Sequence, residues 1–179
     1  KSHAKNVFNI TYYLYNALKS IHHLGDEFYH IIKTSSMLHD CGISINYYSH
    51  HKHSFYIILN SSINGLTHKE LLMSAAIAAS HRFNSYQTPI SPFSSIINQL
   101  DLKTIKYIGA LVKIAEGLDR SLAGAVKNLN VSFDEDKVII NVYSNIDVDF
   151  EIRQALRAKE IFKEVYGKDL VIISCSNSI

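Results

Sequence analysis

The sequence predicts a mainly α-helical protein with a small β-β-α-β appendage at its carboxyl end. Apolar residues recur at helical spacing until about residue 122, and from Leu129 onward the pattern changes to strict alternation. The chain has 179 residues, 47% of them hydrophobic, which is enough for one substantial core. The change of pattern near residues 123–128 is the candidate boundary, so we expect a helical domain over 1–124 and a small α+β appendage over 125–179 packed on it.

Two amphipathic helices are predicted first, over residues 4–21 and 26–40. The apolar stripe of the first helix, extended back by one turn, includes His3. The inner face of the second ends at the doublet His39-Asp40, and Gly42 is a stop signal just beyond it. The doublet is therefore expected at a helix end.

The following segments are read from local signals. The run HHKH at residues 50–53 is expected in a loop before a short apolar helix over 55–59. Thr67 and Glu70 form a T-x-x-E capping box, which opens a helix that ends at His81. Both prolines fall in a predicted loop over 83–93, and Asp101 is the predicted cap of a long helix through residue 122.

The appendage is predicted from alternation and from one further helical pattern. Residues 129–133 and 138–142 form a hairpin around a charged turn at 134–137. An amphipathic helix over 150–166, ended by Gly167, precedes a last apolar strand over 170–174.

Composition excludes several classes of protein. A net charge of +2, without a basic run, does not favour a nucleic-acid partner. No apolar stretch is long enough to span a bilayer, and no signal peptide is visible, so we expect no membrane association. Two distant cysteines fit a reducing compartment, so a cytoplasmic protein is expected. The start without methionine suggests a fragment of a longer protein.

The distribution of the histidines indicates a metal-binding site. All ten lie within the first 81 residues, and among them is His39-Asp40. Asp119 shares an apolar helical face much later in the chain, and a buried carboxylate needs a partner. Imidazole nitrogens and carboxylate oxygens suit divalent Mn, Fe, Zn or Mg, which activate water against phosphoryl groups.

Specific words in the sequence also resemble a known family. The ordered set His3, His39-Asp40, His81 and Asp119 resembles the H…HD…D signature of the HD-domain metal-dependent phosphohydrolases. The words LHDCGISINYYSHHKHSFYIILNS, SHR, AEGLDRS and RAKEIFKEVYG resemble the carboxy-terminal HD-like region of exopolyphosphatase and guanosine pentaphosphatase (Ppx/GppA) proteins. This resemblance implies an HD-type helical core.

The resemblance also implies roles for individual residues. His3, His39, Asp40 and Asp119 match a mononuclear metal set, and His53 and His81 match positions that bind a second metal or the substrate phosphate. Asp40 would orient or deprotonate the attacking water, and positive charge would come from Lys52, Arg82 and Arg120.

The resemblance implies partners and leaves three functions open. In this family the phosphatase chemistry is attributed to amino-terminal actin-like lobes, whereas the HD-like region is associated with polyanion binding and dimer contacts. The chain is expected to be a metal-binding phosphoanhydride hydrolase for polyphosphate or a phosphorylated nucleotide such as guanosine pentaphosphate. The alternatives are a non-catalytic polyphosphate-binding module or a dimerisation module of a larger exopolyphosphatase. A homodimer and the actin-like lobes are the expected protein partners.

Structural alternatives apply to most of these residues. His3 could fray in solvent, and the doublet with Asp119 could be a buried hydrogen-bonded remnant. Among the run at 50–53 we favour His53, with the other two histidines as exposed loop residues or polyanion contacts. His22, His23, His30 and His68 are expected at the surface, and Cys41 is expected as a small buried thiol. Arg120 could instead pair with a helix carboxylate, and Lys52 could be solvated. Residues 83–85, where relatives carry basic residues, suggest weaker polyphosphate binding.

Overall fold

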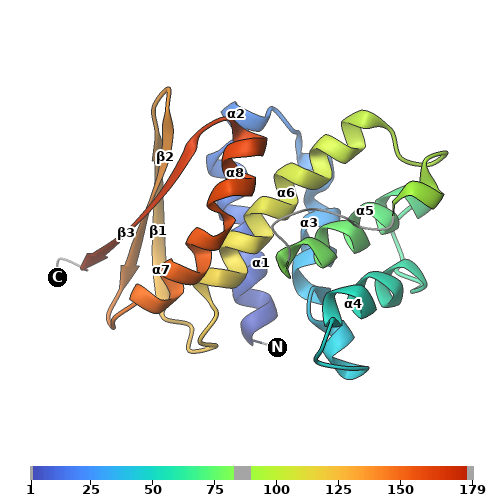
Figure 1. The fold of residues 1–179 in the computed structure, drawn as a ribbon, viewed down its shortest axis with the longest axis horizontal. Helices are drawn as coiled ribbons and strands as arrows, with labels where there is room; N and C mark the ends of the chain where they lie inside the picture. Colours follow the sequence, from blue (N-terminus) through green and yellow to red (C-terminus); the bar gives the residue numbers. More distant parts are fainter. Residues whose placement is uncertain (1, 83–89, 177–179) are drawn as a thin grey trace.

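The computed structural model describes residues 2–82 and 90–176, and the prediction of a mainly helical protein with a small carboxyl-terminal sheet is confirmed (Figure 1). The amino-terminal part contains α1 (Ser2–Ala17), α2 (Lys19–His22), α3 (Tyr29–Leu38), α4 (His50–Leu59), α5 (His68–Ala79) and α6 (Gln99–Leu118). The carboxyl-terminal part contains β1 (Val126–Phe133), β2 (Lys137–Ser144), α7 (Asp149–Ala155), α8 (Lys159–Tyr166) and β3 (Asp169–Ser176). No helix within 2–82 and 90–176 combines the length and apolarity needed to cross a membrane.

Short 3-10 turns join several of these helices. They are η1 (Asp26–Phe28), η2 (Cys41–Ser44), η3 (Ser80–Arg82), η4 (Ser91–Phe93) and η5 (Leu156–Ala158). The predicted loop over 83–93 is described only from residue 90 onward, and there it includes η4; residues 83–89 lie outside the described chain. The helix predicted over 150–166 is two helices, α7 and α8, with η5 between them.

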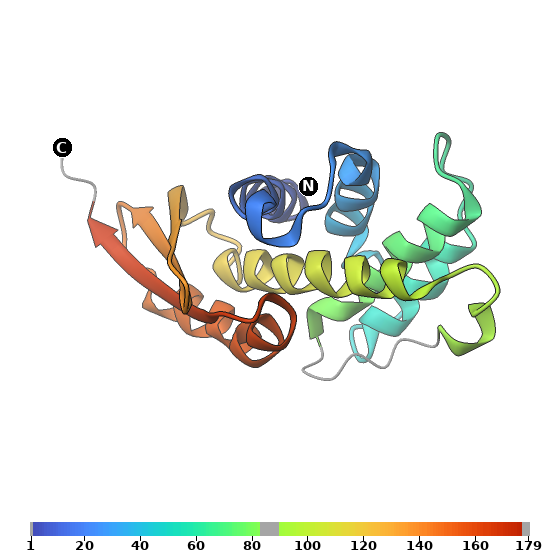
Figure 2. The same cartoon turned by 90° about the horizontal axis from the view of Figure 1, so that it is seen from above.

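The long helix α6 runs through the middle of the molecule (Figure 2). It contacts α1 and α5 in the amino-terminal part and α7 and α8 in the carboxyl-terminal part. Most of its residues are buried, as expected for a helix covered on all sides rather than along one stripe. A Cβ atom at Gly117 would lie 2.4 Å from the backbone nitrogen of Ala155, so only glycine allows α6 and α7 to approach this closely.

Capping explains where α5 and α6 begin. The predicted capping box of α5 is present, because Thr67 accepts from the Glu70 N–H and Glu70 accepts from the Thr67 N–H. The prediction of Asp101 as the cap of α6 was wrong. Asn98 is the N-cap, and Asp101 is the third helical residue, whose carboxylate accepts from the Asn98 N–H at 2.9 Å. Both boxes satisfy backbone donors that a helix start leaves unpaired.

The sheet has the order β1-β2-β3, with β1 and β2 antiparallel and β2 and β3 parallel. Alternate residues of β2, namely Val138, Ile140 and Val142, are buried, as the alternation predicts. These side chains belong to one continuous core that also includes side chains from α1, α3, α6 and α8. The appendage is thereby packed against α6 through α7 and α8, and α6 in turn contacts α1 and α5.

Candidate metal centre

Four histidines from four parts of the chain surround the carboxylate of Asp40. His3 lies in α1, His39 directly follows α3, His50 is the first residue of α4, and His81 lies in η3 after α5. The side chains of His39, His50 and His81 are at most 3% exposed, whereas that of Asp40 is 33% exposed. The cluster is therefore buried on the imidazole side and open on the carboxylate side.

Local backbone geometry orients three of the four rings in the same way. The Nδ1 atom of each donates to the carbonyl oxygen three residues earlier, at 2.7 Å for His39, 2.9 Å for His50 and 2.6 Å for His81. A carbonyl can only accept, so each Nδ1 carries the hydrogen. In the neutral ring Nε2 is then a lone-pair donor, and it faces the cluster.

The Nε2 atoms converge on both oxygens of one carboxylate. Asp40 Oδ1 lies 3.0 Å from His50 Nε2 and 3.5 Å from His81 Nε2. Asp40 Oδ2 lies 3.5 Å from His39 Nε2 and 3.8 Å from His3 Nε2. Asp40 thus joins two groups of three potential ligands, one with His3 and His39 and one with His50 and His81, in each of which the ligand atoms lie within 4.8 Å of one another.

The electrostatics of this arrangement are compatible with a bound cation. Burial lowers the pKa of His39 and His81 below the ordinary imidazole value, so both rings are neutral at pH 7. The Nε2 atoms of His50 and His81 lie 3.0 Å apart, and the buried Nε2 of His39 has no hydrogen-bond partner in the structure. The Nε2 atom of neutral His81 presents a lone pair to the cluster, and a buried acceptor without a donor, such as Nε2 of His39, is costly. A divalent metal on each side of Asp40 fits these donors.

Ser54 and Gly42 fix the position of α4 against the doublet. The Ser54 hydroxyl donates to the His39 carbonyl at 2.7 Å and accepts from the Gly42 N–H at 2.9 Å. A Cβ atom at Gly42 would lie 2.1 Å from the carbonyl oxygen of His50. The absence of a side chain at Gly42 therefore allows α4 to bring His50 to Asp40.

Comparison with known protein families identifies the chain. Residues 1–165 match the family described as Ppx/GppA phosphatase, domain III. The chain belongs to the Ppx/GppA family. The resemblance read from the sequence words is thereby confirmed at the level of this family, and the family as a whole is one of phosphatases.

The structure corrects several expectations for histidines in this Ppx/GppA domain. His50 and His51 were predicted as exposed loop residues, but α4 begins at His50 and both side chains are buried. Burial lowers the pKa of His51 to about 4. His53 is half-buried and belongs to neither group of potential ligands in the described chain, whereas His50, which sequence reasoning missed, belongs to one.

His22 was also predicted at the surface, and that prediction was wrong. It is 5% exposed and its Nε2 donates to the Tyr15 carbonyl at 2.8 Å, while its Nδ1 accepts from the Leu24 N–H. The other three histidines without a motif, at positions 23, 30 and 68, are exposed as predicted. Cys41 is a half-buried thiol whose pKa is raised by burial, which does not favour a thiolate ligand.

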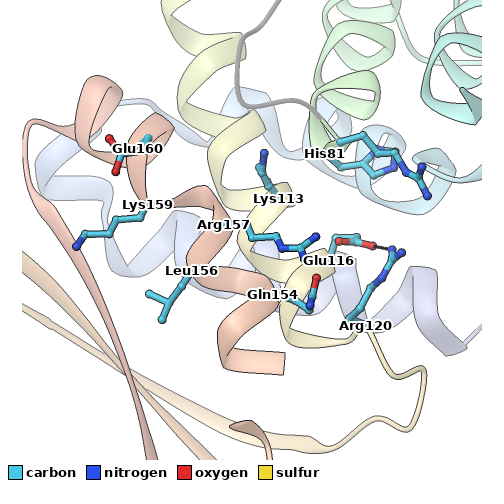
Figure 3. Close-up of a pocket in the computed structure, with 10 residues that line it drawn as sticks. His81, Lys113, Glu116, Arg120, Gln154, Leu156, Arg157, Lys159 and Glu160 are labelled. Carbon is cyan, nitrogen blue, oxygen red and sulfur yellow. Dashed lines mark hydrogen bonds and ion pairs between the residues drawn. The ribbon is translucent and has the colours of Figure 1, made fainter. Parts of the chain in front are cut away.

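A cationic cavity of about 900 Å³ begins at His81 and follows α6 towards α7 and α8 (Figure 3). Its lining contains more basic than acidic side chains. The basic ones are Arg82, Lys113, Arg120, Arg157 and Lys159, and the acidic ones are Glu116 and Glu160. Lys113 is 7% exposed, and burial lowers its pKa. A lining of this kind favours an anionic ligand.

Of the three residues predicted to supply positive charge, two line this cavity and one does not. Arg82 and Arg120 line it, whereas Lys52 is exposed on α4 and does not belong to its lining. Arg82 lies over the ring of Tyr47, 5.3 Å from the ring centroid. Arg120 pairs with Glu116, the helix carboxylate that the sequence offered as an alternative (Figure 3). Glu116 was not singled out from the sequence, although it lies one helical turn before Arg120 in the word AEGLDRS.

Proposed function

We propose that this Ppx/GppA domain binds two divalent metal ions at the histidine cluster and hydrolyses phosphoanhydride bonds of polyphosphate or guanosine pentaphosphate. The observation that carries the proposal is the convergence of four imidazole Nε2 atoms on Asp40 at the end of a cationic cavity. Such a donor set with a nearby anion site suits metal-dependent phosphoryl transfer.

The residues divide into two halves that share one carboxylate. His3 and His39 with Asp40 Oδ2 would hold one ion, and His50 and His81 with Asp40 Oδ1 would hold the other. Two imidazoles for each carboxylate oxygen favour Mn, Fe or Zn over Mg, which prefers oxygen ligands. When bound, such ions supply Lewis acidity and lower the pKa of water.

The cavity side chains would hold the substrate beside this centre. Arg82 and Arg120 both line the cavity that begins at the cluster residue His81. Their planar donors match phosphoryl oxygens and would stabilise charge as it develops there. Lys113, Arg157 and Lys159 lie further along the cavity, where they would bind more distant phosphates of an extended chain.

The test begins with metal content and follows with turnover. Protein purified without chelator or metal-affinity tag is analysed for Mn, Fe, Zn and Mg, and phosphate release from polyphosphate and guanosine pentaphosphate is measured. His81→Ala should lose metal and turnover, whereas His30→Ala, at an exposed histidine outside the cluster, should keep both. Wild-type protein that does not bind added metal and releases no phosphate would contradict the proposal.

A second function is favoured by the basic residues that extend beyond the cluster towards α8. The domain would then be a polyphosphate-binding module of a larger exopolyphosphatase whose chemistry belongs to actin-like lobes. This alternative predicts binding of polyphosphate without turnover, with an affinity that falls steeply as salt rises. A homodimer also remains a proposal, and sedimentation of the purified chain tests it.

A further inference from the structure

We infer that Asp119, together with Asn6, positions His3 and does not itself bind metal. This inference rests on the proposed metal-binding function, and it differs from the ligand role that the family signature implies for Asp119. Asp119, the last residue of the signature, would then orient a metal ligand without contacting the metal.

Both carboxylate oxygens of Asp119 already have partners in α1. Oδ2 lies 2.7 Å from His3 Nδ1, and Oδ1 accepts from Asn6 Nδ2 at 3.1 Å. The Asp119 side chain is 2% exposed, so solvent does not compete for these bonds. Neither group of potential metal ligands in the described chain includes Asp119.

The bond from His3 to Asp119 has the same effect as the carbonyl bonds of the other cluster histidines. A carboxylate accepts the Nδ1 hydrogen, so the Nε2 lone pair of His3 faces the cluster, where it lies 3.8 Å from Asp40 Oδ2. His39, His50 and His81 obtain this orientation from carbonyls only three residues away, whereas His3 obtains it from a residue 116 positions away. A carboxylate also makes the ring a stronger donor than a carbonyl does.

The position of Asp119 links two helices through this contact. Asp119 is the C-cap of α6, and its N–H bonds to the Ala115 and Glu116 carbonyls, so its backbone is held by the helix end. Asn6 lies one helical turn after His3 on α1 and reaches the same carboxylate. The orientation of His3 thus depends on the packing of α1 against the end of α6.

The experiment compares Asp119→Asn with Asp40→Asn in the full chain. Metal content is measured by elemental analysis, affinity by competition with a chromophoric chelator, and the ligand set by the visible spectrum of the Co²⁺ form. The amide oxygen that Asp119→Asn introduces can still accept from His3, so we expect full metal content, an unchanged pattern of Co²⁺ bands and an affinity lower by about 10–100-fold. Asp40→Asn should lose metal and change the Co²⁺ spectrum.

A second variant isolates the orienting contact. Asn6→Ala removes only the other partner of Asp119, and we expect a smaller loss of affinity, below about 10-fold, with the same Co²⁺ bands. Loss of one metal equivalent in Asp119→Asn, or Co²⁺ bands altered as in Asp40→Asn, would show that Asp119 is a ligand and overturn the inference. Wild-type affinity in Asp119→Asn would overturn it equally. Failure of the wild type to bind metal would instead refute the proposed function itself, and with it this inference.

Discussion

Replacing Gly42 by alanine should separate α4 from the doublet and weaken metal binding. The new Cβ would lie 2.1 Å from the His50 carbonyl oxygen and 2.4 Å from the Ser54 backbone nitrogen. The first contact must open by about 1 Å to reach 3.0 Å, the limit below which real Cβ contacts essentially never fall. Because both clashing atoms belong to the backbone of α4, the helix start must move, and it carries the His50 ring away from Asp40.

A shift of this size exceeds what a metal site tolerates, because ligand distances are held to about 0.2 Å. We expect the half of the centre that contains His50 to lose at least about 10-fold in affinity, in line with other changes to the surroundings of metal ligands. Overpacking should also cost about 1–3 kcal/mol of unfolding free energy. For a chain of this size that corresponds to a melting temperature lower by roughly 3–10 °C.

The assay combines chelator competition with thermal unfolding in excess chelator. Gly65→Ala is the matched control, because Gly65 has a φ of +89° and nothing within 4 Å of its added Cβ. That control should lose stability through backbone strain and keep wild-type metal affinity. A Gly42→Ala protein with wild-type metal affinity and melting temperature would refute the reasoning that α4 packs too closely on Gly42 to leave room for a side chain.

Three further predictions concern other parts of the molecule. Ser54→Ala should cost about 1–3 kcal/mol in denaturant unfolding, because two buried backbone groups lose their partner, whereas Ser44→Ala at an exposed turn should cost far less. Glu116→Gln should raise polyphosphate affinity about 3–10-fold at low salt, because it frees Arg120 and removes a negative charge from the cavity; an unchanged affinity by fluorescence titration would contradict this. Burial lowers the pKa of His22 below 6.5, so the unfolded chain binds more protons as pH falls below that value and the folded state loses stability there. Thermal unfolding from about pH 7 to 5 should therefore show a smaller decline in His22→Gln, and an equal decline would exclude this contribution.

Local signals in the sequence were sufficient for most elements of the fold. The capping box at Thr67 and Glu70 involves residues one helical turn apart, so sequence alone reveals it. The alternation in β2 likewise identifies the buried face, because side chains of a strand point to opposite sides. The true cap of α6 was missed because Asn98 and Asp101 both have residue types that cap helices, and the sequence does not show which one starts the helix.

The identity of the histidine beside Asp40 was not predictable in the same way. The choice among His50, His51 and His53 depends on where α4 begins and how it is rotated. Ser49, directly before α4, has a φ of +57°, a backbone conformation that residues other than glycine seldom adopt. No sequence pattern predicted that conformation, and it sets which of the three rings faces the doublet.

Sequence by itself determined the family, most of the secondary structure and the kinds of donor available at the centre. These properties depend on which residue types occur a few positions apart. Hydrophobic periodicity, helix caps and family motifs are patterns of that kind, so the sequence shows them directly. Only the tertiary structure decided that His50 rather than His53 meets Asp40, that both oxygens of Asp40 are shared, and that Asp119 bonds to His3. The physical reason is that these donors come from separate helices, so their distances depend on how the helices pack through the common core rather than on any local spacing.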